Sequence, residues 1–194
     1  DDLHRCGLDD ERIRVIRVEG ESRWVLSYAF NLGLKSARFE SIVKADADIT
    51  LAPDFFERNL LRAGSFIAGD WRNSHPGQSF TNGLFYIQRE YILECGGFNE
   101  FINSYGWDDE ELYSRLIEMG LTRNELAADT AKHLDHSDSA RVNTVPPKAG
   151  APAIETLIGD TDFLIRRNRY IANTMSPWSQ AQPAMEYEVL HDSP

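Results

Sequence analysis

The chain has 194 residues, of which 42% are hydrophobic and 26% are charged, and its formal net charge is −11. This composition suits one globular domain and argues against a nucleic-acid partner, because phosphate backbones require a basic protein surface. No apolar run approaches the length of a membrane span, we recognise no signal peptide, and two cysteines are too few for a disulfide framework. We therefore expect a cytoplasmic protein, with peripheral attachment to a membrane left open.

Strand-like and helix-like segments alternate along most of the chain. Alternating apolar residues predict strands, and apolar residues at three- and four-residue spacing predict helices. In chain order, the pattern predicts a strand over 12–18, a helix over 23–37, a strand over 39–49, a helix over 52–63, a strand over 65–71, a loop over 73–83, a strand over 84–88, helices over 89–97 and 107–120, a short strand within 127–136 and a helix over 161–175. This order predicts an α/β fold, in which ligands bind at the carboxyl ends of strands.

Two aspartates stand at the end of the predicted strand over 39–49. The sequence KADADIT places Asp46 and Asp48 on either side of a single alanine. In a strand, residues i and i+2 point to the same side, so we expect both carboxylates to face the same way. Each of two neighbouring carboxylates raises the cost of ionising the other. A divalent cation would offset this cost, so the motif indicates metal chemistry.

One enzyme class that uses such a motif is the haloacid-dehalogenase-type phosphatases. DADIT matches their D-x-D-x-T motif, in which the first aspartate is a nucleophile and the second is a general acid. That chemistry also requires a lysine after the nucleophile, and the sequence has none between Asp48 and Asp108. The phosphohydrolase hypothesis is therefore the weaker of two.

The second hypothesis depends on the segment around the aspartates, NLGLKSARFESIVKADADITLAPDFF, and on motifs that follow it in order. They are GGFNE at 96–100, GWDDEELYSRL at 106–116 and KHLDH at 132–136. Together with the sequence around the aspartates, they resemble GT-A nucleotide-sugar glycosyltransferases that have a galactosyltransferase-type C-terminal half. The resemblance implies a mixed sheet flanked by helices, without the first strands of the GT-A fold. We expect one such domain over 1–178, incomplete at its N-terminus, and a tail over 179–194.

The resemblance implies a metal site. The donor would be a UDP-sugar, and a hard cation, Mn²⁺ or Mg²⁺, stabilises the charge of its departing diphosphate. Asp48 matches the position of a metal ligand. Asp46 matches a position that holds ribose, sugar or metal-bound water, and it is a second candidate ligand. A histidine would complete the protein ligands and favour Mn²⁺, and both His133 and His136 fit this role.

The resemblance also implies a catalytic base on the helix that follows Trp107. Asp109 matches the base, which would take the proton of the acceptor hydroxyl, and Asp108 matches a residue that binds donor or acceptor hydroxyls. The acids over 108–111 also suit the positive end of a helix. Helix electrostatics alone explain the two glutamates of this run, so we assign them no chemistry.

Two further residues are candidates for substrate contacts. Trp107 would stack on an acceptor ring, because aromatic faces suit the C–H faces of sugars, and Arg23 is the nearest candidate for a diphosphate contact. We therefore expect a metal-dependent, inverting glycosyltransferase that moves a sugar from a UDP-sugar to a hydroxyl of a glycan or another acceptor. A non-catalytic module that binds sugar nucleotides or carbohydrate is the alternative.

Overall fold

A computed structural model of the chain describes residues 10, 12–19, 25–102, 106–134, 161–174 and 186–191. The largest sheet in these residues has four strands in the order β2-β5-β4-β6. They are β2 (Ser41–Lys44), β4 (Ser65–Ala68), β5 (Phe85–Gln88) and β6 (Thr122–Glu125). β5 runs antiparallel to β2 and β4, whereas β6 runs parallel to β4. The carboxyl ends of β2, β4 and β6 and the amino end of β5 therefore share one edge of the sheet.

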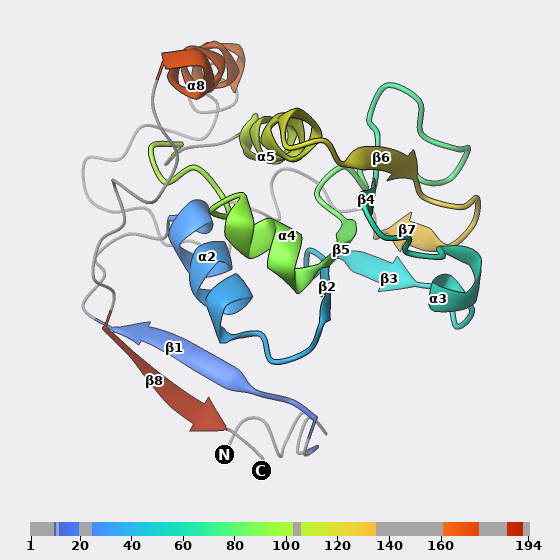
Figure 1. The fold of residues 1–194 in the computed structure, drawn as a ribbon, viewed down its shortest axis with the longest axis horizontal. Coiled ribbons are helices and arrows are strands. Elements are labelled where there is room, and N and C mark those ends of the chain that lie inside the picture. Colours follow the sequence, from blue (N-terminus) through green and yellow to red (C-terminus); the bar gives the residue numbers. More distant parts are fainter. Residues whose placement is uncertain are drawn as a thin grey trace.

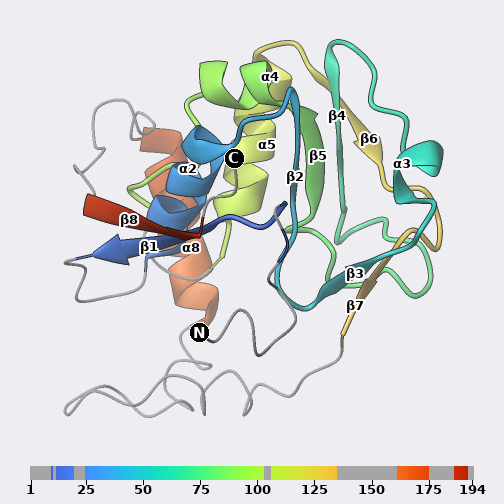
Figure 2. The ribbon, with the colours of Figure 1, turned by 90° about the horizontal axis from the view of Figure 1, so that it is seen from below.

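Three helices cover one face of this sheet (Figure 2). They are α2 (Leu26–Ser36), α4 (Arg89–Glu94) and α5 (Asp108–Glu118). Alternate residues of the strands point toward them, as the pleat requires. The resulting core contains Leu34 of α2, Ile92 of α4, Leu112, Tyr113 and Leu116 of α5, and Phe66, Ala68, Phe85 and Ile87 of the strands.

A short ribbon and a single helical turn cover the opposite face. The ribbon pairs β3 (Ile49–Leu51) with β7 (Ala131–His133) antiparallel, and the helical turn is α3 (Phe55–Arg58). Their core contains Phe55, Ile67, Leu84, Leu126 and Ala131. Ile67 lies between Phe66 and Ala68, which belong to the other core, so β4 is buried on both faces.

The remaining elements lie outside these layers (Figure 1). Helix α8 (Thr161–Thr174) lies beside α5, and a second ribbon pairs β1 (Val15–Glu19) with β8 (Glu186–His191) antiparallel. β8 falls within the segment over 179–194, in which the sequence showed no element. In the described part of the chain, no helix has both the length and the apolar character that a membrane span requires.

The α/β class predicted from the sequence is confirmed, whereas several elements are shorter than predicted, two of them markedly. The strand expected over 39–49 ends at Lys44, and a turn separates β2 from β3. The helix expected over 52–63 is reduced to the four residues of α3. Its end is fixed by Asn59, which donates through Nδ2 to the carbonyl of Phe55 (2.8 Å) and accepts through Oδ1 from the amide of Ala127 (2.9 Å). This tertiary contact outweighs the helix propensity of 60–63.

Candidate functional site

The candidate residues gather at the edge where β2, β4 and β6 end. Asp46 and Asp48 lie in the turn after β2, whose closing bond runs from the amide of Ile49 to the carbonyl of Asp46 (3.0 Å). The expectation that one strand presents both carboxylates on the same side was wrong, because the strand has already ended. Each carboxylate instead has a partner of its own.

Asp46 pairs with a lysine that the sequence reasoning did not single out. Lys44 Nζ lies 2.7 Å from Asp46 Oδ1, and the lysine side chain is only 9% exposed. The ammonium group also lies 4.3 Å from the centre of the Phe30 ring, which is a favourable cation–π distance. A charged group in an otherwise apolar strand was the available sequence signal for Lys44.

Gly83, at the amino end of β5, shows that three charged groups converge. A Cβ atom placed on Gly83 would lie 2.6 Å from Asp46 Oδ2, 3.0 Å from Lys44 Nζ and 3.5 Å from Asp109 Oδ2. A side chain at this position would displace the charged ends of these groups. The structure therefore brings together the first aspartate of the turn and the candidate base, which are more than 60 positions apart in the sequence.

Asp109 is held in the first turn of α5. Its Oδ2 atom lies 3.5 Å from Asn82 Nδ2, and the backbone carbonyl of Asn82 accepts a 2.7 Å hydrogen bond from Tyr113 Oη. Its Oδ1 atom is buried and makes no hydrogen bond to the described residues. Burial, and next the negative charge of Asp108, raise the pKa of Asp109 well above its ordinary value of 3.8, although Lys44 acts in the opposite direction. A raised carboxyl pKa suits a group that must accept a proton.

Asp108 belongs to the same electrostatic group. Burial is the main reason that the pKa of Asp108 is raised, and the negative charge of Asp46 adds to the effect, whereas Lys44 opposes it. Three carboxylates, those of Asp46, Asp108 and Asp109, thus share one lysine. Such a cluster has capacity for additional positive charge or for protons.

Asp48 points to a different partner, on β7. Its Oδ2 atom lies 3.3 Å from His133 Nε2, and the amide of Leu134 donates to its carbonyl (2.7 Å). The pairing of Ile49 with His133 in the β3–β7 ribbon fixes this approach. The Phe80 ring lies 5.6 Å from the His133 ring, and the Phe80 side chain is 71% exposed. Phe80 is a second residue that the sequence reasoning missed.

The predicted metal ligands are only partly assembled by the described residues. Asp48 and His133 lie together, whereas His136 falls outside the described ranges, as does Arg23. In the ranges that the structure describes, no group of three or more His, Cys, Asp or Glu side chains is arranged to hold a metal ion. One carboxylate and one imidazole nevertheless form a donor pair that suits Mn²⁺.

Trp107 has an unusual backbone at the start of α5. Its φ angle is 70°, and that of the preceding Gly106 is 87°. A non-glycine residue in this left-handed region costs about 1–2 kcal/mol, so neighbouring contacts must hold it. The guanidinium of Arg169, on α8, lies 4.5 Å from the centre of the Trp107 ring. One face of the ring is therefore covered, which restricts the stacking on an acceptor that we expected.

The GGFNE segment connects α2 to α5 through hydrogen bonds. Asn31, which is buried in α2, donates to the carbonyl of Phe98 (2.9 Å) and accepts from its amide (2.8 Å). Asn99 Nδ2 donates to Glu111 Oε1 (3.1 Å), and Arg115 forms a 2.7 Å ion pair with Glu111. These bonds tie α2, the turn after α4 and α5 into one unit. The motif that carries much of the family resemblance thus acts on the site by holding α2 and α5 together.

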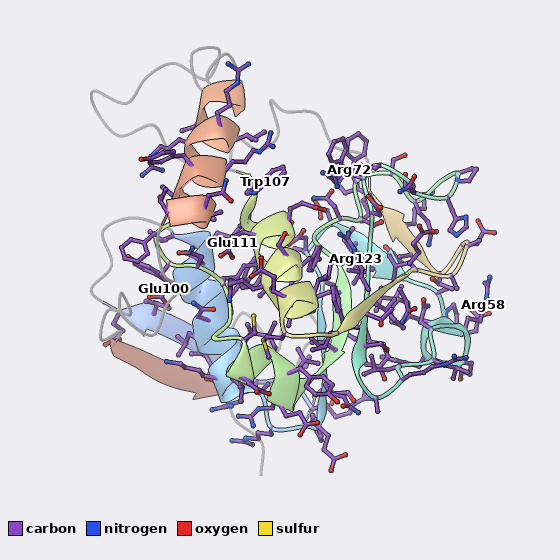
Figure 3. All side chains as sticks on the ribbon, turned by 45° about the horizontal axis from the view of Figure 1, so that its top comes forward. Arg58, Arg72, Glu100, Trp107, Glu111 and Arg123 are labelled. Carbon is purple, nitrogen blue, oxygen red and sulfur yellow. The ribbon has the colours of Figure 1, made fainter. Side chains whose placement is uncertain are left out.

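Glu110 likewise has a structural environment. It forms ion pairs with Arg72 (3.1 Å) and Arg123 (3.4 Å). The guanidinium of Arg123 also lies 4.5 Å from the centre of the Tyr113 ring. Figure 3 shows Arg123 on the β6 side of α5 and Trp107 on the α8 side. Glu110 therefore links α5 to the loop after β4 and to β6.

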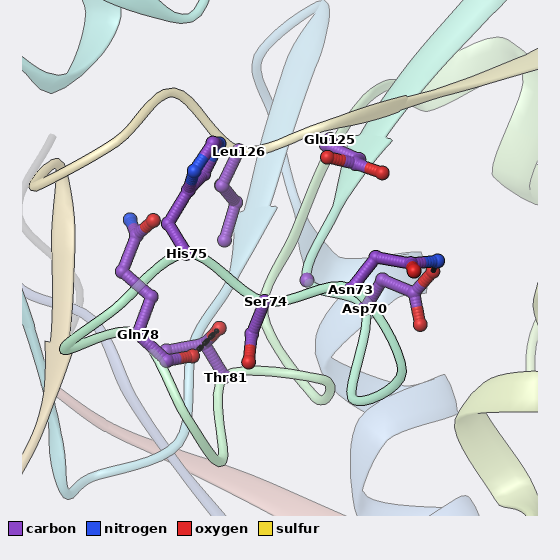
Figure 4. A pocket seen from close by; sticks show the side chains of 9 residues that line it. Asp70, Asn73, Ser74, His75, Gln78, Thr81, Glu125 and Leu126 are labelled. Carbon is purple, nitrogen blue, oxygen red and sulfur yellow. Dashed lines mark hydrogen bonds between the residues drawn. The ribbon is translucent and has the colours of Figure 1, made fainter.

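A polar pocket opens beside the candidate site (Figure 4). It lies between the loop after β4 and the end of β6. Its lining includes Asp70, His75, Gln78, Thr81 and Glu125. Thr81 immediately precedes Asn82 and Gly83, so the pocket and the charged cluster share one loop.

Comparison with known proteins identifies part of the chain. Residues 62–137 match a family model described as the N-terminal domain of galactosyltransferase. This segment is galactosyltransferase-like in sequence. The predicted glycosyltransferase resemblance is therefore confirmed from the residues before β4 to those after β7. The galactosyltransferase-like segment contains Gly83, Asp109 and His133, whereas Asp46 and Asp48 precede it.

The other comparisons add structural neighbours. No curated protein matches the chain. Two similar solved structures are of Drosophila β1,4-galactosyltransferase 7: its catalytic domain with xylobiose, and a mutant with manganese, UDP-Gal and xylobiose. Both are 19% identical to the chain and have TM-scores of 0.49. They cover 69% and 72% of this chain, which spans 60% and 62% of theirs.

Proposed function

We propose that the chain is a metal-dependent, inverting glycosyltransferase that moves a sugar from a UDP-sugar to a hydroxyl group of a glycan or another acceptor. The observation that carries this proposal is the convergence of Asp46, Lys44 and Asp109 around Gly83, beside the Asp48–His133 pair. The match of residues 62–137 to a galactosyltransferase family model supports the reaction class.

Asp109 is the proposed catalytic base. As the acceptor oxygen attacks the anomeric carbon, its proton passes to the carboxylate of Asp109, and the bond between that carbon and the diphosphate oxygen breaks. Attack from the face opposite the leaving group inverts the anomeric centre. The raised pKa of Asp109 makes its carboxylate a stronger base than an exposed one. The positive charge of Lys44 opposes this rise in the pKa of Asp109.

Asp48 and His133 are the proposed protein ligands of the metal ion. Their donor atoms lie 3.3 Å apart, and a carboxylate with an imidazole suits Mn²⁺ better than Mg²⁺. When bound, the ion would supply positive charge that stabilises the departing diphosphate. His136 remains a candidate for a further ligand, and Asp46 is the less suitable one, because Lys44 already occupies one of its oxygens.

Phe80 is the proposed platform for the acceptor. Its ring is 71% exposed and lies next to His133, and an exposed aromatic face suits the C–H face of a sugar. Trp107 has one face covered by Arg169, so it would offer at most its other face. We assign the main stacking contact to Phe80 and a supporting role to Trp107.

Two measurements on one variant test the proposal. In the wild-type chain, UDP and Mn²⁺ together should raise the melting temperature, because a ligand that binds only the native state stabilises it. Asp109→Asn should keep this shift while transfer from UDP-sugars falls by about 10²–10⁴-fold, the usual contribution of a general base. Glu118→Gln is the matched control, since Glu118 lies exposed on the same helix.

Three outcomes would count against the proposal. Persistence of transfer in Asp109→Asn would refute the assignment of the base. A shift with UDP that needs no metal would refute the metal site. Binding of UDP-sugars without transfer to any hydroxyl acceptor would favour the non-catalytic module instead.

A further inference from the structure

Helix α8 contacts the backbone immediately before the proposed catalytic base. Three of its residues, spaced i, i+3 and i+4 along one face, reach Gly106 and Trp107. Figure 1 shows α8 beside the start of α5. The segment lies at 106–107, only two positions before Asp109, whereas α8 begins at Thr161. A late helix therefore meets the candidate site through the main chain.

Asn168 makes the polar contact. Its side chain is fully buried, and Nδ2 donates a 2.7 Å hydrogen bond to the carbonyl of Gly106. The other end of the amide, Oδ1, accepts from Arg167 Nη1 at 3.3 Å, which orients the group with its donor toward Gly106. Removal of this buried amide would leave the carbonyl of Gly106 without a hydrogen-bond donor, at the full desolvation cost of that carbonyl.

Ile165 and Arg169 complete the contact on either side. A Cβ atom on Gly106 would lie 2.8 Å from Ile165 Cγ1, so the isoleucine occupies the space in which a side chain would stand. Arg169 covers one face of the Trp107 ring. Gly106 and Trp107 both have left-handed backbone angles. Glycine adopts such an angle without strain, whereas Trp107 keeps it only where the surroundings hold it.

The start of α5 depends on this conformation. The carbonyl of Trp107 accepts the first helical bond, from the amide of Glu111 (3.0 Å). Within the described ranges, no side chain caps this end of the helix. The direction in which Asp108 and Asp109 leave the first turn is therefore set by the backbone at Gly106 and Trp107.

We propose that Asn168 is a positioning residue, which aims Asp109 at the acceptor by holding the left-handed turn at Gly106 and Trp107. This inference rests on the proposed function only because that function makes Asp109 the catalytic base. Asn168 reaches the backbone before Asp109 through the carbonyl of Gly106. Its effect passes through two backbone residues, so it should alter the rate of the chemical step more than the binding of the donor.

The first experiment compares Asn168→Ala with Tyr170→Ala, whose side chain is 71% exposed on the same helix. Asn168→Ala should lower kcat by about 10–100-fold, the usual result of a misplacement near 1 Å. The Kd for UDP with Mn²⁺ should change by less than about twofold. Tyr170→Ala should leave both values unchanged. A fall in kcat of less than threefold for Asn168→Ala, or an equal loss of UDP affinity, would overturn the proposal.

The second experiment needs no activity and so separates this inference from the proposed function. Hydrogen exchange of the peptide that covers 106–112 should become at least about tenfold faster in Asn168→Ala, because the held turn opens locally. Peptides from β4 and β5 should keep their wild-type exchange. Arg169→Ala, which removes an exposed side chain, should cause a smaller acceleration in the same peptide. Unchanged exchange over 106–112, or equal acceleration throughout the chain, would refute the positioning role even if transfer is never observed.

Discussion

The two aspartates of KADADIT lie in two different regions of the site. Asp46 lies on the side of β5 and α5, with Lys44 as its partner and Asp109 across Gly83. Asp48 lies on the side of the β3–β7 ribbon, with His133 as its partner. Two residues that are nearly adjacent in the sequence thus contribute to separate groups, because the turn after β2 directs them apart.

The charges of the two regions also differ. On the Asp46 side, three carboxylates share one lysine, and the pKa values of Asp108 and Asp109 are raised. On the Asp48 side, a carboxylate meets an imidazole. The first region suits proton transfer and the second suits a divalent cation. An Asp-x-Asp motif therefore need not be a single ligand group, and its two halves can be tested one at a time.

Among the changes that compare the two regions, the largest effect is expected from Gly83→Ala, which places a methyl group between the charged side chains. The new Cβ would stand 2.6 Å from Asp46 Oδ2 and 3.0 Å from Lys44 Nζ, closer than van der Waals contact allows, so the ion pair must shift. Transfer should fall by about 100-fold, as expected for a misplaced reacting group. Steady-state kinetics, with Mn²⁺ affinity measured in parallel, would check this prediction.

Gly33→Ala provides the matched control. Gly33 lies inside α2, where an added Cβ meets nothing within 4 Å. This change should leave transfer intact and raise the free energy of unfolding by about 0.5–1 kcal/mol. If Gly83→Ala weakened Mn²⁺ binding as strongly as it slowed transfer, the two regions would have to be treated as one.

The sequence predicted much of this arrangement, for identifiable reasons. The alternation of elements was sufficient for the α/β class, whereas Asp109 and His133 were singled out by the resemblance to GT-A enzymes. The sequence could not show that β2 ends at Lys44, because KADADI continues the apolar alternation of the strand. Lys44 and Gly83 were missed because their importance arises only from a contact between β2 and the start of β5.

An intermediate effect on Mn²⁺ binding is expected when each of the two aspartates is replaced in turn. Asp48→Asn should weaken the binding of Mn²⁺ by at least about tenfold, since a carboxylate ligand is replaced by a neutral amide. Asp46→Asn should weaken it much less, because Lys44 already neutralises that carboxylate, although transfer should still fall. Calorimetric titration of Mn²⁺ in the presence of UDP would compare the two variants directly.

His133→Gln is the companion variant on the Asp48 side. It should reproduce the loss of Mn²⁺ affinity seen with Asp48→Asn, and combining the two changes should add less than the sum of their single effects, because both act on one contact. Equal losses of affinity for Asp46→Asn and Asp48→Asn would show instead that both aspartates bind the ion.

The smallest effect concerns stability, and it tests the charges on the Asp46 side. Because the pKa of Asp109 is higher in the native state than in the unfolded chain, the native state binds this proton more tightly. Its contribution to the free energy of unfolding is therefore fully present below the ordinary pKa of 3.8 and is lost as the pH rises through the raised value. Asp109→Asn removes this loss, so it should raise the Tm at pH 7, by about 2–4 °C for each kcal/mol recovered.

The pH dependence of this gain in Tm shows whether a buried charge causes it. The gain in Tm from Asp109→Asn should shrink as the pH falls toward the ordinary pKa of the carboxyl group, where wild-type Asp109 is protonated in both states. Lys44→Met should lower the Tm at pH 7, since Lys44 opposes the rise in the pKa of Asp109, and adding Asp109→Asn to it should restore part of the loss. Asp48→Asn, which breaks the pair with His133, should bring no such gain. A gain from Asp109→Asn that is the same at every pH would mean that improved packing, and not the removal of a buried charge, stabilises the variant.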